Sequence, residues 1–240
     1  MNNTGYISLS RQAAIRRHMD VIANNIANAT TPAFKAERVM FAEYVGKGAG
    51  VQRMSFVYDV GVTRDSREGT LVDTGNVLDL AIKGPGYFAI QTASGETLYT
   101  RNGRFRLDDT GKIVTSQGQA VLDEQNRPIS VPASDSRIEI TRDGALSTES
   151  GVAGRLKIVR FDDEQSLRPI ADGLLKSDKP PQPATDSLVV QGMLEDSNVR
   201  PVVEITNMID AMRSYQNAQQ MVQNEHERML KTIDTFTRTN

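Results

Sequence analysis

Few residues in this sequence have the types and spacing that chemistry requires. The only histidines are His18 and His226, and there is no cysteine, so a zinc site would lack most of its usual ligands. The run Asp162-Asp163-Glu164 is interpreted as a solvated turn, because no nucleophile motif accompanies it. The sequence therefore predicts no catalytic residue, no cofactor, no metal ion and no small-molecule substrate.

Two further groups of residues could bind a phosphate or a membrane. Gly84 and Gly86 lack the Gly-x-x-x-x-Gly-Lys-Ser/Thr pattern of a phosphate loop. Strand-like residues flank them, which favours a tight turn. Arg11, Arg16 and Arg17 could form the basic face of a helix on a membrane surface. Because the same segment carries a regular apolar stripe, we favour packing against another helix.

The composition argues against nucleic acid as a partner. The 240 residues include 28 lysines and arginines and 30 aspartates and glutamates, so the formal net charge is -2 and there is no overall basic field. Hydrophobic residues make up 38% and aromatic residues 5%, which is lean for a chain that buries all of itself. We therefore expect some apolar surface to be buried against other subunits.

No apolar run is long enough to cross a bilayer as a helix, which takes about 18 residues. The first thirty or so residues also lack the unbroken apolar core of a cleaved secretory signal. If the protein leaves the cytoplasm, we expect it to use another export route. The lack of cysteine is compatible with reducing and oxidising compartments.

The N-terminal segment has the periodicity of a helix from about Ile7 to Ala29. Its apolar residues recur three or four positions apart and form a narrow stripe, which suits a partner helix better than a broad core. Pro32 ends the pattern, because the residue before a proline is pushed out of the helical region. The stripe consists of Ile15, Met19, Ile22, Ile26 and Ala29.

The C-terminal segment predicts a second helix from Pro201 to about residue 237. Its length would be about 55 Å. So long a helix with only one narrow apolar stripe is not stable on its own. His226 interrupts the stripe and is interpreted as a polar residue that restricts the register. The stripe consists of Ile205, Met208, Met212, Tyr215, Gln219, Val222, His226, Met229, Ile233 and Phe236.

Between these segments the pattern changes to two-residue alternation interrupted by turn residues, which is typical of strands and hairpins. Strands are predicted at 78–82, 87–90, 112–114 and 155–159. The glycine-rich stretch from Gly46 to Gly50 is predicted to be a flexible joint.

The sequence as a whole predicts an α+β fold. Long N- and C-terminal helices would pair as a coiled-coil-like stalk beside one antiparallel β domain. The predicted boundaries are an N-terminal helix in 1–34, a linker in 35–60, a β-rich outer domain in 61–197 and a C-terminal helix in 198–240.

Three stretches resemble the axial proteins of the bacterial flagellar rod and hook. The first is residues 21–36, VIANNIANATTPAFKA, where Ala33 replaces the glycine usual in the family. The second combines GPGYF at 84–88 with YTRNGRF at 99–105. The third is QGMLEDSNV at 191–199, which continues into the predicted C-terminal helix. Their order and spacing resemble the family over nearly the whole chain.

The resemblance implies a structural, non-enzymatic subunit that polymerises helically, with its terminal helices at the axis and its β domain outside. The chain has the second pattern, at 84–88 and 99–105, but is shorter than hook proteins. It is therefore most similar to a proximal-rod subunit, with a distal-rod or hook subunit as the alternative. The implied partners are further copies of the chain, other rod proteins and the flagellar type III export apparatus. The implied location is the rod in the periplasm of a Gram-negative cell.

Three asparagines lie beside the N-terminal stripe, although asparagine is a poor helix former. Asn24, Asn25 and Asn28 could form a polar outer face. We favour hydrogen bonds to neighbouring subunits, because buried amides need partners. Together with the two stripes, these asparagines are the residues predicted to mediate subunit assembly.

Two other classes of protein stay open on the residues alone. A secreted carbohydrate-binding β protein with helical oligomerisation arms would need an aromatic groove, or paired carboxylates if it were hydrolytic, yet the chain has no tryptophan, 7 phenylalanines and 6 tyrosines. A secreted coiled-coil adhesin would share the helices but not the three patterns.

Overall fold

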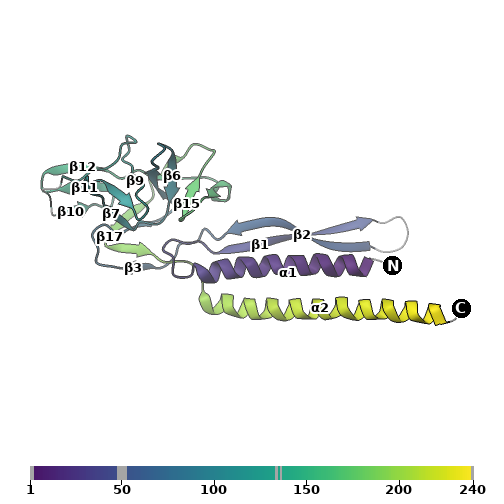
Figure 1. The fold of residues 1–240 in the computed structure, drawn as a ribbon. Coiled ribbons are helices and arrows are strands. Elements are labelled where there is room, and N and C mark those ends of the chain that lie inside the picture. Colours follow the sequence, from purple (N-terminus) through teal and green to yellow (C-terminus); the bar gives the residue numbers. More distant parts are fainter. Residues whose placement is uncertain (1–2, 48–52, 133–134, 136, 239–240) are drawn as a thin grey trace. The chain divides into compact units, whose positions relative to one another are not determined.

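The computed structural model describes residues 3–47, 53–132, 135 and 137–238. Contacts within the chain divide it into two units (Figure 1). The helical unit comprises the described parts of 1–29, 36–65 and 199–240, and the β unit comprises 30–35 and 66–198.

The helical unit contains two helices close to the predicted ranges. Helix α1 spans Asn3–Ala27 and helix α2 spans Pro201–Arg238. Pro201 opens α2, a position where the missing N–H of proline breaks no helical hydrogen bond. Because α2 has 38 residues, it is about 57 Å long.

A two-stranded ribbon completes the helical unit. Strands β1 (Glu37–Lys47) and β2 (Arg53–Arg64) pair antiparallel, with a register shift between Met40 and Phe41. Helix α1 contacts both strands and also α2, and it lies between the ribbon and α2 in Figure 1.

The ribbon corrects the predicted linker at 35–60. Residues 37–47 and 53–60 belong to strands instead, where β1 and β2 pair with each other along their length. Most of the predicted flexible joint from Gly46 to Gly50 falls on 48–52, outside the described residues.

The predicted coiled-coil-like stalk is wrong, although the α+β class is compatible with the structure. A coiled coil would match the two stripes along one seam. Here α1 contacts α2 and also both strands of the ribbon. Among the described side chains of α2, the buried ones are Ala211 and Ala218, which lie outside the predicted stripe. Their small side chains let α1 and α2 pack without the larger interlocking side chains of a heptad seam.

The strands of the β unit pair antiparallel. Their bounds are β3 Leu71–Asp73, β4 Leu80–Lys83, β5 Tyr87–Gln91, β6 Thr97–Thr100, β7 Phe105–Leu107, β8 Ile113–Thr115, β9 Ala120–Val121, β10 Ile138–Ile140, β11 Ala145–Thr148, β12 Gly151–Arg155, β13 Ile158–Arg160, β14 Arg168–Pro169, β15 Leu174–Lys176, β16 Gln182–Pro183, β17 Leu188–Gln191 and β18 Met193–Glu195, with a short 3-10 helix at Glu164–Ser166.

These strands form one large sheet and three small ones. The large sheet follows the order β14-β15-β6-β5-β9-β8-β7, and β13 joins it by pairing with β5 and β16. The small sheets are β10-β11-β12, β17-β4 and β18-β3. The predicted strands at 78–82, 87–90 and 112–114 overlap β4, β5 and β8, and the strand predicted at 155–159 overlaps β12 and β13.

Side chains of β5 alternate between two apolar clusters. Phe88 and Ile90 belong to the larger cluster, and Tyr87 and Ala89 belong to the smaller one. Phe88 is fully buried and meets Phe105 edge to face at 5.2 Å between ring centroids. Because successive side chains of a strand point to opposite faces, β5 is covered on both faces and lies at the centre of the β unit.

Two glycines in the stretches 84–88 and 99–105 have clear steric roles. Gly84 adopts a φ of 100°, which favours glycine, in the short bend from β4 to β5 where a tight turn was predicted. At Gly103 a Cβ atom would lie 1.7 Å from the carbonyl oxygen of Leu80. Any side chain at Gly103 would therefore push β4 away.

Candidate assembly surfaces

The predicted N-terminal stripe packs inside the helical unit. Ile22 is 2% exposed, and Ile15, Met19 and Ile26 are partly buried. Val21, which the stripe did not include, is buried too. The stripe thus contributes to the core of the helical unit, and its contact with neighbouring subunits stays a prediction.

Asn25 joins three elements of the helical unit. Its side chain is buried, and its Oδ1 accepts a hydrogen bond from the backbone N–H of Glu37 at 2.8 Å. Its Nδ2 donates to the backbone oxygen of Glu37 at 2.9 Å and to the Glu204 carboxylate at 3.4 Å. The amide therefore satisfies both backbone groups at the start of β1 and also reaches α2.

The other two asparagines also form hydrogen bonds within the chain. Asn24 donates to the Glu37 carboxylate at 3.1 Å. Asn28 donates to the backbone oxygen and to the side-chain oxygen of Asn24, both at 2.9 Å. Hydrogen bonds from Asn24 and Asn28 to neighbouring subunits stay a prediction.

A polar contact fixes the register between the helices. Arg16 of α1 donates to the hydroxyl of Tyr215 on α2 at 3.1 Å. Its guanidinium carbon lies 5.9 Å from the centroid of the same ring, within the range of a cation–π interaction. One of the three arginines considered for membrane binding thus contacts the partner helix.

The predicted C-terminal stripe divides between two faces of α2. Met208 and Tyr215 are partly buried and lie on the side of Ala211 and Ala218. The stripe residues with exposed side chains are Ile205, Met212, Gln219, Val222 and His226. The side chains of Met229, Ile233 and Phe236 lie outside the described residues.

An apolar stripe is left on the outward face of α2. We call Val202, Ile205, Ile209 and Met212 the outer stripe; their exposed fractions are 79%, 49%, 45% and 47%. Spacings of three and four place them on one face of the helix, opposite Ala211. The sequence analysis missed Val202 and Ile209, although both continue the spacing from Ile205.

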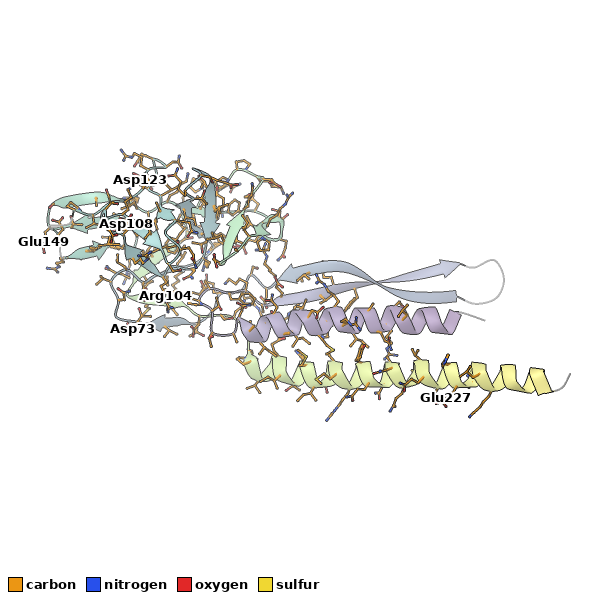
Figure 2. All side chains as sticks on the ribbon, in the orientation of Figure 1. Asp73, Arg104, Asp108, Asp123, Glu149 and Glu227 are labelled. Atoms are coloured by element: carbon orange, nitrogen blue, oxygen red, sulfur yellow. The ribbon has the colours of Figure 1, made fainter. Side chains whose placement is uncertain are left out.

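Three acidic side chains of the β unit stabilise turns. Asp108 and Asp123 (Figure 2) each accept backbone N–H groups two and four residues ahead. Hydrogen bonds from the Thr110 hydroxyl and from backbone amides hold the pKa of Asp108 below its usual value. Asp163 accepts from the N–H of Gln165 and caps the short 3-10 helix, as expected for a turn.

The residues that the structure describes contain no group of three or more histidine, cysteine, aspartate or glutamate side chains placed to hold a metal ion. His18 lines a small pocket with Ile15 and Phe41, and His226 is exposed. Within the same part of the chain, no helix is long and apolar enough to cross a membrane.

Comparison with known proteins bears on both units. Three family models match: flagella basal body rod protein over residues 6–35, the D1 domain of flagellar hook protein FlgE/F/G over 81–148, and the C-terminal model of flagellar basal body rod FlgEFG protein over 190–235. The first match covers most of α1, and the third covers most of α2.

Full-length relatives agree with these matches. Flagellar basal-body rod protein FlgF of Caulobacter vibrioides is 38% identical, and the match covers 100% of both chains. The chain belongs to the flagellar basal-body rod protein family. FlgF of Mesorhizobium japonicum is 34% identical over 90% of each chain, and FlgG of Agrobacterium fabrum is 33% identical over 88% of this chain and 90% of its own.

Membership of the rod protein family confirms the resemblance inferred from the three sequence patterns. The protein is a structural component of the flagellar basal-body rod. The family patterns extend beyond the helices, since the turn at Gly84 and the close approach at Gly103 belong to the β unit.

Proposed function

We propose that this rod protein polymerises helically by burying the outer stripe of α2 against neighbouring subunits. The observation that supports this proposal is the exposure of four apolar side chains in one row, since soluble proteins seldom leave such a row in water. A helical polymer requires a contact between two different surfaces of the subunit. The predicted assembly residues of α1 and the rest of α2 would contribute further contacts.

The partners in this proposal are copies of the chain and other rod proteins. The chain would occupy the proximal rod, as a FlgF-type subunit, in the periplasm of a Gram-negative cell. It would reach that place through the flagellar type III export apparatus. A FlgG-type, distal position is the second candidate, because FlgG of Agrobacterium fabrum has nearly the same identity to this chain as FlgF of Mesorhizobium japonicum.

The proposed role is mechanical and involves no catalysis. The described acidic residues Asp108, Asp123 and Asp163 are engaged in turns, and packing of subunits requires no reaction. The carbohydrate-binding and adhesin alternatives lose support, because family membership extends over the whole chain.

Replacing Met212 by Asp tests the proposed surface. A carboxylate in the outer stripe would be buried without a partner at every subunit contact, which costs several kcal/mol. We expect cells with Met212→Asp to build no rod beyond this subunit and to be non-motile. The purified variant should unfold within about 0.5 kcal/mol of the wild type, as surface variants do.

Two controls make the result specific. Asn217→Asp introduces the same side chain at another exposed position of α2, outside the outer stripe, and should leave motility intact. Phe88→Asp buries a charge in the β unit and should unfold it. Normal swimming of Met212→Asp cells would contradict the proposal.

A further inference from the structure

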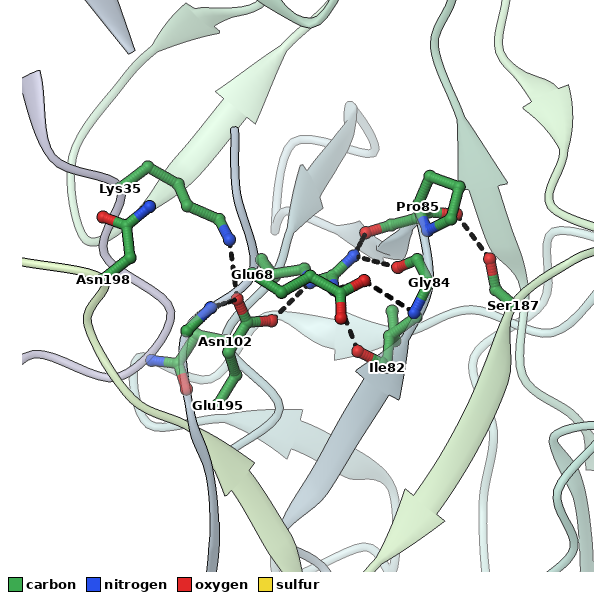
Figure 3. A network of polar contacts seen from close by, with 12 residues as sticks. Lys35, Glu68, Ile82, Gly84, Pro85, Asn102, Ser187, Glu195 and Asn198 are labelled. Carbon is green, nitrogen blue, oxygen red and sulfur yellow. Dashed lines mark hydrogen bonds and ion pairs between the residues drawn. The ribbon is translucent and has the colours of Figure 1, made fainter. Parts of the chain in front are cut away.

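Three charged side chains from distant parts of the sequence meet inside the β unit (Figure 3). The Glu195 side chain of β18 is 1% exposed. Its Oε1 accepts from Lys35 Nζ at 2.6 Å, and its Oε2 accepts from Arg101 Nε at 2.6 Å. We call these three residues the Glu195 cluster. None of them was singled out as functional by sequence analysis.

Further donors of Arg101 bind β4 and the segment that connects it to β5. Nη1 donates to the carbonyl oxygens of Gly84 at 2.8 Å and Gly86 at 2.7 Å, and Nη2 donates to that of Ile82 at 2.9 Å. A buried ion pair is tolerated when its hydrogen bonds are complete. The guanidinium donates these three hydrogen bonds and the one to Glu195, and its Nη2 lies 3.5 Å from the Glu68 carboxylate, so most of its donors are engaged and it links the segment after β4 to Glu195.

The Glu195 cluster also holds segments that lead to the helical unit, at three of the four places where the chain passes between the units. Lys35, the last residue before the helical unit resumes at Ala36, donates to the Arg67 carbonyl oxygen at 2.9 Å, and Asn198, the last residue before Val199, donates to the same oxygen at 2.8 Å. The backbone N–H of Ala33 donates to the Glu195 carbonyl oxygen, and that of Asn198 donates to the Phe34 carbonyl oxygen.

We propose that the Glu195 cluster holds these connecting segments to the β unit by electrostatic attraction, and that removing the Glu195 charge releases them while the apolar core of the β unit stays folded. This proposal does not depend on the assembly surface of α2. The released segments would be 30–35, 66–71 and 193–198. The core around Phe88 is held by apolar packing and by strand pairs that do not involve the cluster.

Acid should release the same segments, because it protonates Glu195. Burial raises the pKa of the Glu195 carboxyl, but the charges of Arg101 and Lys35 and their hydrogen bonds outweigh it and hold the pKa below its usual value. The stabilisation is therefore complete above the unfolded pKa of about 4.3 and is lost as the pH falls through the lower folded pKa. The other charged groups beside the cluster are Glu68, which lies 3.5 Å from Arg101, and Arg67 and Glu164 in the adjoining pocket.

Hydrogen exchange of the full-length chain with Glu195→Gln tests the proposal. The backbone N–H of Gly69 also donates to Glu195 Oε1 at 2.9 Å. We expect the backbone amides of Ala33, Gly69 and Asn198 to exchange about tenfold faster or more, because the variant removes the counterion of the buried Arg101 and the partly buried Lys35. The amides of Ala89 and Leu122, which bond to other backbone groups in the core, should be unchanged. Glu96→Gln is the matched control, since Glu96 pairs with Lys176 at the same distance of 2.6 Å on the surface.

A second variant and a pH series test the proposal even if the Glu195→Gln variant does not fold. Lys35→Gln removes only the partly exposed cation and should release 30–35 and 193–198 without affecting the core. The difference in urea midpoint between wild type and Lys35→Gln should stay constant from pH 7 to about pH 5 and shrink below about pH 4. Equal acceleration of all amides, or no change at Ala33 and Asn198, would overturn the proposal.

Discussion

At the scale of single residues, Asn25 shows how one amide can hold an element in place. Its carbonyl and NH2 groups pair with the backbone N–H and C=O of Glu37, much as a neighbouring strand would. The start of β1 therefore needs no further strand at that point. The residue type was noticed in the sequence, but its partner was not, because no strand was predicted at Glu37.

Replacing Asn25 by Ala should destabilise the helical unit. The substitution leaves the partly buried N–H of Glu37 without its acceptor, which costs about 1 kcal/mol. Urea unfolding followed by the helical circular dichroism signal measures the loss. Asn24→Ala, at the exposed neighbouring position, should change stability by less than about 0.5 kcal/mol. Equal effects of the two variants would show that the Glu37 pairing contributes nothing.

The Glu195 cluster could not be predicted from the sequence for a different reason. Residues 35, 101 and 195 lie in separate family patterns, and no local periodicity connects charges so far apart. Only the pairing of β18 with β3 and the path of the N-terminal connection bring them together. Long-range ion pairs of this kind carry no signal in a single sequence.

At the scale of elements, α2 has two faces and a change of environment along its length. Up to Ala218 one face packs against α1. From Gln219 onward the described side chains, which include 219–224, 226–228 and 230–231, are all exposed. None of these described side chains is a buried apolar residue that would stabilise this half of α2 in a single subunit, although helices of this kind depend on packing.

Limited proteolysis of the purified subunit should therefore begin in the C-terminal half of α2. Trypsin should cleave first after Arg228 or Lys231, and the β unit should persist as a resistant fragment, because local opening is easiest where few apolar contacts are buried. Mass spectrometry of early fragments identifies the sites. Initial cleavage inside the β unit, for example after Lys157, would contradict this view of α2.

The sequence predicted both helices and much of the β unit because each has a strong local pattern. It did not predict the ribbon β1–β2, whose glycine-rich neighbourhood at Gly46 suggested a joint. Nor could it divide the C-terminal stripe into a packed and an exposed face. That division follows from the small residues Ala211 and Ala218, which periodicity of large apolar side chains does not detect.

At the scale of the whole molecule, the subunit keeps apolar surface that it does not cover itself. The lean composition indicated such a surface, and the outer stripe locates part of it on α2. The β unit has a complete core of its own around Phe88. In the proposed assembly, folding within the chain and burial between chains involve different residues, so variants in the two sets should have different effects.

A density map of the intact basal body, resolved to side chains, tests the central claim most directly. Val202, Ile205, Ile209 and Met212 are 79%, 49%, 45% and 47% exposed in the single chain. We predict that neighbouring rod subunits cover all four, so that each becomes as buried as the residues of a protein core. An outer stripe that faces water in the assembled rod, with subunits joined through other surfaces, would contradict the account.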